Sequence, residues 1–184
     1  MSDTLRVGVI GAGGNTRKLH IPGLQRQKGV EVVAVANRTR ASGAAVAAEF
    51  GIETVCDSWD EIIDDPTIDA VCIGTWPYMH APLTVAALDA GKHVLCEARM
   101  AMNSGEAHAM LEASQMCPTL VAQIVPAPLT FPLDRTIIDM VGNGYIGDVI
   151  SIDARVALGS NFPLWDAPYH WRMNRELSGN NIMS

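Results

Sequence analysis

Five residues near the N-terminus have the types and the spacing of a phosphate-binding turn. Gly11 and Gly13 occupy the first two positions of a G-x-G-x-x-G pattern, and Gly14, Asn15 and Thr16 complete it. Gly11 permits a tight turn, and Gly13 lets the backbone approach a pyrophosphate at the N-terminus of the following helix. Thr16 stands where Gly or Ala is usual, so we expect slightly looser packing of this helix on its strand. The pattern predicts a dinucleotide site; an ordinary glycine turn of an α/β protein is the alternative.

Residues 36–40 lie about 20 positions beyond the glycine turn, where a dinucleotide-binding protein contacts the adenosine ribose. An Asp or Glu at this place would accept hydrogen bonds from both ribose hydroxyls, and Asn37 lacks that charge. Arg38 and Arg40 are able to embrace a 2′-phosphate instead. The segment therefore favours NADP over NAD. The alternative is that both arginines are solvated residues at the start of a helix.

A second group of polar and aromatic residues, Thr75, Trp76, Pro77 and His80, follows the fourth predicted strand. The carboxyl end of a strand in an open α/β sheet lines the ligand crevice. Trp76 is suited to pack on a ring of the cofactor, although a buried tryptophan is an equally good interpretation. His80 is a candidate contact for cofactor or substrate, and we favour capping or packing as the role of its side chain.

The elements that position these residues alternate between short β-branched runs and longer helical patterns. Strands are expected at 5–10, 30–36, 54–56, 70–73, 93–96 and 120–125, and helices at 16–28 (bent or broken near Pro22), 40–50, 59–64, 81–90 and 104–116. This alternation predicts a parallel sheet covered on both faces, an α/β fold of the doubly wound Rossmann type. Residues 1–125 are interpreted as the NAD(P)-binding domain.

The pattern changes after residue 125, where three prolines fall within seven residues. A helix at 132–141 and a strand at 150–158 are expected beyond them. Residues 126–184 are too few to bury a sheet of their own, so we interpret them as the incomplete start of an α+β substrate and oligomerisation domain.

Composition excludes several classes of function. The 184 residues carry a formal net charge of −7, which argues against nucleic acid as a partner. The apolar runs are much shorter than the roughly 20 residues a membrane span needs. None of the four cysteines forms a C-x-x-C pair, so neither a metal site nor a redox dithiol is expected. With no basic N-terminal signal, the expected location is the cytoplasm.

The motifs together resemble those of the glucose-fructose oxidoreductase, inositol dehydrogenase and rhizopine-catabolism family (Gfo/Idh/MocA). Its pattern is a glycine turn, then T-x-P-x-x-x-H, then A-G-K-H-V-x-x-E-K-P, then G-x-I-G and W-R. This chain matches it, approximately in the second motif, at Thr75, Pro77, His80, Ala90-Gly91-Lys92-His93-Val94, Glu97, Gly144-Tyr-Ile-Gly147 and Trp171-Arg172. The resemblance implies an NAD(P)-dependent dehydrogenase that transfers a hydride between nicotinamide and a hydroxyl or carbonyl of a sugar, cyclitol or related small metabolite. It also implies cofactor contacts at Glu97, Ala98, Trp171 and Arg172, and a homo-oligomer for the full-length protein.

Departures from the family pattern concern catalysis. The family's E-K-P is Glu97-Ala98-Arg99 here. The resemblance implies a lysine beside the nicotinamide that orients or deprotonates the substrate hydroxyl, and Ala98 can do neither. Arg99 is the remaining candidate, suited to bind an anionic or hydroxyl-rich substrate but a poor base. A structural ion pair, with Glu97 or a neighbouring subunit, is the alternative for Arg99.

The family also carries a catalytic histidine in a strand that follows W-R. Alignment of residues 178–184 with that strand leaves this histidine without a counterpart. We therefore expect a fragment of a longer enzyme, inactive alone. The alternative is a non-catalytic dinucleotide-binding or sensing module.

Overall fold

The structure is a computed structural model that describes residues 4–125, 133–153 and 170–179. It divides into two units, one of residues 1–125 and 171–184 and the other of residues 126–170. The assignment of residues 126–184 to a substrate domain stays a prediction.

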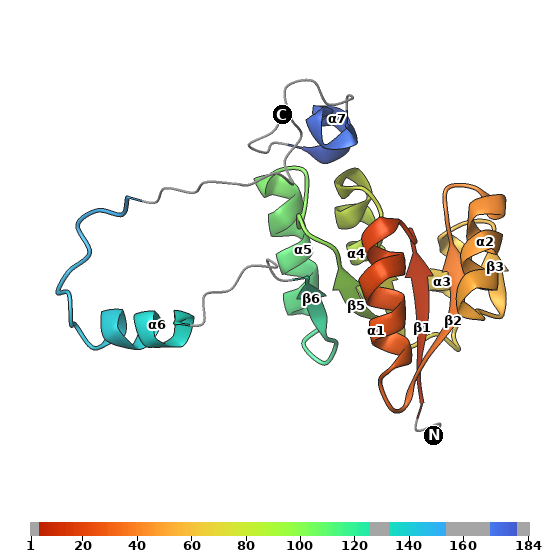
Figure 1. Cartoon of the computed structure of the whole chain (residues 1–184), viewed down its shortest axis with the longest axis horizontal. Coiled ribbons are helices and arrows are strands. Elements are labelled where there is room, and N and C mark those ends of the chain that lie inside the picture. Colours follow the sequence, from red (N-terminus) through yellow and green to blue (C-terminus); the bar gives the residue numbers. More distant parts are fainter. Residues whose placement is uncertain (1–3, 126–132, 154–169, 180–184) are drawn as a thin grey trace. The chain divides into compact units, whose positions relative to one another are not determined.

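The first unit is built on a six-stranded parallel sheet in the order β3-β2-β1-β4-β5-β6. The strands are β1 (Leu5–Ile10), β2 (Val30–Ala36), β3 (Thr54–Cys56), β4 (Ala70–Ile73), β5 (His93–Cys96) and β6 (Ala122–Ile124). The strand order reverses between β1 and β4, and this switch point is where open α/β sheets bind ligands. The doubly wound Rossmann-type fold is confirmed (Figure 1).

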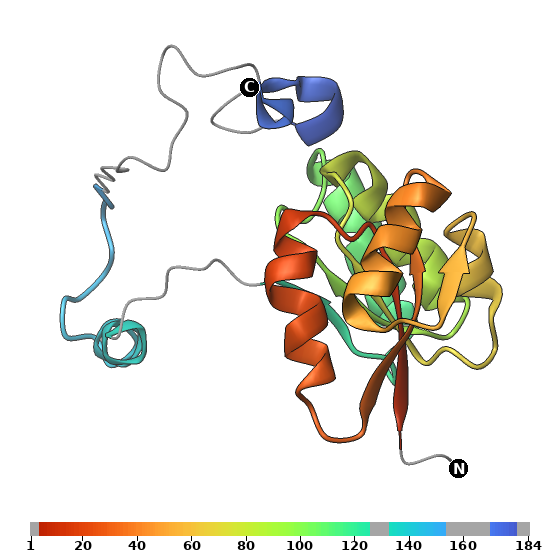
Figure 2. The ribbon, with the colours of Figure 1, turned by 45° about the vertical axis from the view of Figure 1, so that its right-hand side comes forward.

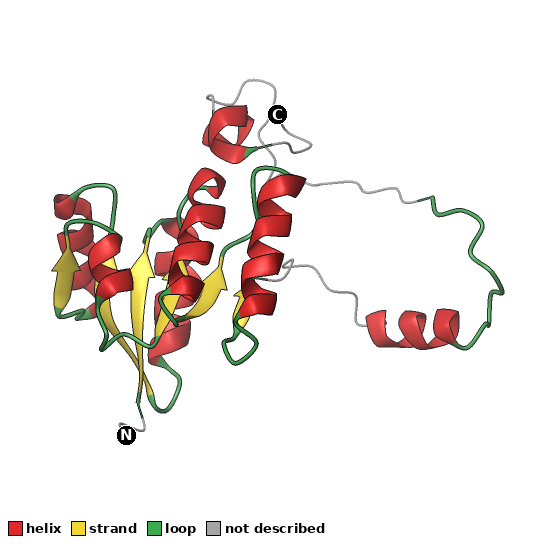
Figure 3. Cartoon of the chain, turned by 180° about the vertical axis from the view of Figure 1, so that it is seen from behind, coloured by secondary structure: helices red, strands yellow, loops and turns green. Residues whose placement is uncertain are grey.

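Helices cover both faces of this sheet (Figures 2 and 3). They are η1 (Thr16–His20, π-helical), α1 (Ile21–Gln25), α2 (Arg40–Phe50), α3 (Asp60–Asp64), η2 (Pro77–Met79), α4 (His80–Asp89) and α5 (Ser104–Met116). Near Pro22, where a bend or break is expected, the helix is continuous: π-helical η1 gives way to α-helical α1 one residue before this proline. Gly51 ends α2 with φ +69°, and the Asn103 side chain accepts a hydrogen bond from Glu106 N–H at the start of α5.

Two apolar cores lie on opposite faces of the sheet because neighbouring residues of a strand point to opposite sides. In β4, Val71 and Ile73 belong to the core that contains Leu83 of α4, whereas Cys72 belongs to the core that contains Ile21 of α1. Burial on both faces explains the nearly continuous apolar runs of these strands.

Two further elements belong to the first unit, η3 (Trp171–Met173) and α7 (Arg175–Ser178). The second unit contains α6 (Asp134–Gly142), close to the expected helix. Residues 150–153 form no strand, and residues 154–158 of the expected strand lie outside the described residues. Within the described ranges, every helix is too short or too polar to cross a bilayer.

A buried lysine joins two loops of the first unit. Lys92 is 4% exposed, and its ammonium donates hydrogen bonds to the carbonyl oxygens of Asp65 (2.7 Å) and Ile68 (2.8 Å). The ammonium group of Lys92 thus connects the turn before β5 to the loop before β4.

We predict that Lys92→Met lowers the free energy of unfolding by about 1–3 kcal/mol, because the buried carbonyl of Ile68 and the partly buried carbonyl of Asp65 lose their donor. Urea unfolding followed by circular dichroism measures this change. The matched control is Lys28→Met, which alters an exposed lysine and should leave the midpoint unchanged. Equal effects of the two substitutions would contradict the role of Lys92.

A second prediction concerns the pH dependence of stability that follows from two buried thiols. Burial raises the pKa values of Cys72 and Cys96 to about 12. In the unfolded chain these thiols lose their protons at a lower pH than in the folded protein. The contribution of the protonated thiols to the free energy of unfolding is therefore complete below pH 9 and is lost as the pH rises toward 12. Between these values, unfolding free energies of the wild type should fall more steeply than those of a Cys72→Ala/Cys96→Ala variant. Parallel curves would contradict the prediction.

Candidate functional site

The glycine turn lies between the carboxyl ends of β1 and β4. Gly11 has φ +85°, and a Cβ there would lie 2.6 Å from Thr75 Cγ2 and 2.7 Å from Thr75 N. No other residue type fits this place, because a side chain would meet both backbone strain and a clash. The backbone N–H of Gly11 donates to Ala36 O of β2 (2.8 Å), so the turn is held from both sides.

The outer side of the turn is open. A Cβ on Gly14 would meet nothing within 4 Å, and one on Gly13 would meet only Gly74 O at 3.8 Å. In the adjacent loop, Thr75 Oγ1 is buried and has no hydrogen-bond partner in the structure. The open glycine surface and the unpartnered hydroxyl both fit a polar ligand such as a dinucleotide.

Thr16 packs closely, and the expectation of looser packing is wrong. Its side chain is 1% exposed, and its hydroxyl donates to Gly11 O (3.2 Å). A Cβ on Gly74 would collide with Thr16 Oγ1. The glycine that the pattern lacks at position 16 is therefore compensated by a glycine on the facing loop.

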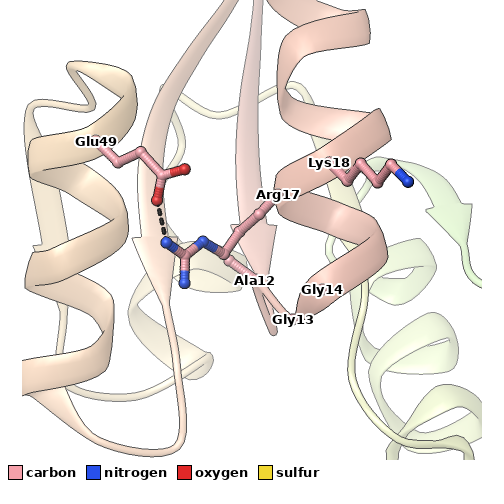
Figure 4. A pocket seen from close by; sticks show the side chains of 6 residues that line it. All are labelled: Ala12, Gly13, Gly14, Arg17, Lys18 and Glu49. Atoms are coloured by element: carbon pink, nitrogen blue, oxygen red, sulfur yellow. Dashed lines mark hydrogen bonds and ion pairs between the residues drawn. The ribbon is translucent and has the colours of Figure 1, made fainter.

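A cavity of about 350 Å³ adjoins the turn, lined by Ala12, Gly13, Gly14, Arg17, Lys18 and Glu49 (Figure 4). Arg17 reaches across to α2 and forms an ion pair with Glu49, whereas Lys18 points away from that pair. Open backbone N–H groups at a helix start, together with nearby cations, favour an anion. This arrangement suits a pyrophosphate.

The residues expected at the ribose lie at the end of β2 and behave differently from one another. Asn37 Oδ1 accepts a hydrogen bond from Ala12 N–H (2.7 Å), so this side chain braces the glycine turn. Arg40 pairs with Asp57 (2.8 Å), which raises the pKa of the guanidinium, first through the hydrogen bond and then through its charge. Arg38 is exposed, with Cζ 5.9 Å from the centre of the Trp76 ring.

Glu97 stands at the carboxyl end of β5 and gathers three donors. Its carboxylate accepts hydrogen bonds from Ala98 N–H (2.8 Å) and Asn15 Nδ2 (3.3 Å), and lies 2.7 Å from His20 Nε2. His20 is a site residue that the sequence reasoning missed. Asn15 and His20 are five positions apart, a separation that brings side chains together on a π-helical turn but not on an α-helix.

His80 joins the two loops that follow β4 and β5. It is 1% exposed, with Nδ1 2.7 Å from Arg99 O and Nε2 3.0 Å from Thr75 O. Pro77 is also buried and opens η2. The contacts of His80 support packing rather than ligand binding, whichever nitrogen carries the hydrogen.

Arg99 makes no ion pair with any carboxylate of the described residues, and Glu97 turns to His20 instead. The alternative of an ion pair between Arg99 and Glu97 is therefore wrong, and the alternative of a pair with a neighbouring subunit stays untested. Arg99 Nη1 donates to Ser178 O (2.7 Å). Burial, and then the nearby charge of Arg172, lowers the pKa of Arg99. Ala98 is exposed beside it.

Aromatic and cationic groups of distant segments meet at the same edge. Trp76 and Trp171 stack with ring centres 5.6 Å apart and an interplanar angle of 18°. Arg172 Cζ lies 4.6 Å from the centre of the Trp171 ring. The structure thus brings Arg38, Trp76, Trp171 and Arg172 into one neighbourhood.

Comparisons with known proteins agree with this geometry. A family model described as an oxidoreductase family with an NAD-binding Rossmann fold matches residues 5–121. The 1,5-anhydro-D-fructose reductase of Ensifer adhaerens is 34% identical over 181 residues, which are 97% of this chain and 52% of the relative. The chain therefore spans about half the length of the curated relatives it matches.

Solved structures are also similar to this chain, among them a ketoreductase and a dehydrogenase. A 3-ketoreductase from Actinomadura kijaniata, in complex with TDP-benzene and NADP, matches with a TM-score of 0.65 and 28% identity over 79% of this chain and 45% of its own. The myo-inositol 2-dehydrogenase of Lactobacillus plantarum matches with a TM-score of 0.64 and 27% identity, covering 80% and 43%.

Two glycine substitutions separate folding from ligand binding. We predict that Gly11→Ala lowers the melting temperature by several degrees, because its Cβ meets Thr75 at a strained φ. Gly14→Ala should leave the melting temperature unchanged, since nothing lies within 4 Å, yet weaken dinucleotide binding by filling the open surface. Thermal unfolding and ligand titration measure the two effects. A destabilised Gly14→Ala variant would contradict this account.

Proposed function

This chain belongs to the Gfo/Idh/MocA oxidoreductase family with its NAD-binding Rossmann fold, and from that premise we propose that it binds NADP in preference to NAD. We further propose that the protein transfers a hydride between the nicotinamide and a hydroxyl or carbonyl of a sugar, cyclitol or related small metabolite. The observation that carries the proposal is the open glycine turn at the switch point, beside the unpartnered hydroxyl of Thr75.

In this proposal, the glycine turn and the start of the first helix hold the pyrophosphate. The backbone N–H of Gly13 donates to Gly11 O (2.9 Å), whereas Gly14 is an exposed residue at the start of the helix, and Arg17 and Lys18 add positive charge at the same place. The nicotinamide of the bound cofactor accepts or supplies the hydride. Glu97, fixed by Asn15 and His20, keeps the loop after β5 in place beside it.

The preference for NADP rests on Arg38. A 2′-phosphate needs a cation at the end of β2, and Asn37 supplies no carboxylate that would repel it. Arg40 is already paired with Asp57, whereas Arg38 makes no ion pair with a described residue and lies near the Trp76 ring. We therefore assign the larger share of 2′-phosphate binding to Arg38.

The substrate class is supported by the names of similar proteins, which include a 1,5-anhydro-D-fructose reductase, a levoglucosan dehydrogenase and a myo-inositol 2-dehydrogenase. All of them act on polyhydroxylated rings. The many hydroxyl groups of such a ring require hydrogen-bond donors, and Arg99 and Arg172 present guanidinium groups at the carboxyl edge of the sheet.

A second candidate function is dinucleotide binding without turnover. Ala98 favours it, because a methyl group at this exposed position has no proton to exchange with a substrate hydroxyl. The two candidates differ in one measurement. NADPH formation from NADP and myo-inositol, or another polyol, by the 184-residue chain would exclude the binding module and contradict the expectation that this chain is inactive alone.

We predict that the wild type binds NADPH more tightly than NADH, and that Arg38→Ala weakens NADPH binding about tenfold while leaving NADH binding nearly unchanged. A lost charge-assisted contact to the 2′-phosphate is the physical reason. Quenching of tryptophan fluorescence during titration measures both affinities.

The matched control is Arg26→Ala, which removes an exposed arginine after the last turn of α1 and should change neither affinity. Tighter binding of NADH by the wild type would reverse the cofactor assignment. Binding of neither nucleotide would overturn the proposed function as a whole.

A further inference from the structure

We propose that Arg99 is a positioning residue that holds residues 171–179, the Trp171 segment, against the carboxyl edge of the sheet. The inference rests on the proposed function, because the purpose of the anchored segment is to keep Trp171 and Arg172 at the nucleotide site. It assigns a role to Arg99, one of the two residues at which this chain departs from the E-K-P motif.

The anchor is a chain of hydrogen bonds that begins at Arg99. Its Nη1 donates to the carbonyl oxygen of Ser178 (2.7 Å), and the Ser178 hydroxyl donates to the carbonyl oxygen of Arg172 (2.9 Å). Ser178 is fully buried, at 0% exposed. A charged donor to a buried carbonyl is among the stronger hydrogen bonds of a protein. Arg99 therefore fixes the end of α7 and, through it, the backbone of Arg172.

Arg99 is itself held firmly at its backbone. Its carbonyl oxygen lies 2.7 Å from Nδ1 of His80, and Nε2 of the same buried ring lies 3.0 Å from Thr75 O. Thr75 directly precedes Trp76, which is the stacking partner of Trp171. The buried side chain of His80 thus connects Arg99 to the loop that carries Trp76. Trp76 is the residue on which the Trp171 segment stacks.

The far end of the segment also meets the sheet unit closely. Gly179 has φ +70°, and a Cβ there would collide with the backbone of Met102, which follows β5. Only a glycine permits this approach. In Figures 1 and 2, α7 lies beyond the end of the sheet toward which the strands point. Within the first unit, the Trp171 segment therefore contacts residues 4–125 at Trp76, Arg99 and Met102.

Charge attraction does not explain this anchor. Arg99 and Arg172 carry like charges that disfavour each other; burial first, and this like charge second, lowers the pKa of Arg99. The attraction comes from the Ser178 carbonyl, which a lysine ammonium is also able to reach as a donor. A cation that keeps its hydrogen bond should therefore preserve the anchor, whereas an apolar side chain should not.

The stacked tryptophans supply a direct measurement of the anchor. A pair of indole rings at 5.6 Å gives a coupled signal in circular dichroism, and Trp171→Phe identifies the part that belongs to this pair. We expect Arg99→Ala to lose that part and to weaken NADPH binding about tenfold, Arg99→Lys to restore most of both, and Arg26→Ala to change neither. In the Trp171→Phe background, Arg99→Ala should cause less further loss of affinity, because the two residues act through one segment.

A second variant covers the case in which Arg99→Ala fails to fold. Gly179→Ala disturbs the opposite end of the segment and should also lose the coupled signal, while the Arg99→Lys variant keeps it. An unchanged signal and an unchanged NADPH affinity in folded Arg99→Ala would overturn the proposal. If the wild type binds neither nucleotide, the proposed function fails, and the coupled signal still decides whether Arg99 anchors the segment.

Discussion

The site depends on the close approach of two backbone segments at the switch point of the sheet. Gly11 and Gly74 both lack a side chain where the turn after β1 meets the loop after β4. A Cβ on either would collide with the other segment, and Thr16 fills the space that Gly74 leaves. Because this contact sets the position of the first helix, it also sets the direction of the exposed N–H groups that a phosphate would meet.

From this contact, two further connections extend along the carboxyl edge. Asn37 Oδ1 binds Ala12 N–H and joins the turn to the end of β2. Glu97 binds Asn15 and His20 and joins the first helix to the end of β5. Both are polar contacts at the rim of a sheet whose interior is apolar. The fold is stabilised by its two cores, and the geometry of the site is determined by these rim contacts.

Sequence patterns predict those features that depend on local periodicity. The strands at 5–10, 30–36, 54–56, 70–73 and 93–96 have the predicted limits, since each is an apolar run ended by turn residues. Thr16 was misjudged because its packing depends on Gly74, a residue distant in the chain. His20 was missed because a helical period of 3.6 separates it from Asn15, and only the π-helical turn brings them together. The bond from Arg99 to Ser178 spans 79 positions and has no local pattern at all.

The charges at the carboxyl edge explain how an acidic chain is able to attract a polyanion. The net charge is −7, yet three carboxylates near the site each have a basic partner: Glu49 pairs with Arg17, Asp57 with Arg40 and Glu97 with His20. Lys18 and Arg38 make no ion pair among the residues described here, so positive charge remains at both ends of the glycine turn. Local potential rather than net charge guides a charged ligand over short distances, because salt screens the more distant carboxylates. A diphosphate over the turn and a phosphate near Arg38 would each meet a cation that no carboxylate of the described residues neutralises, which is the charge pattern of NADP.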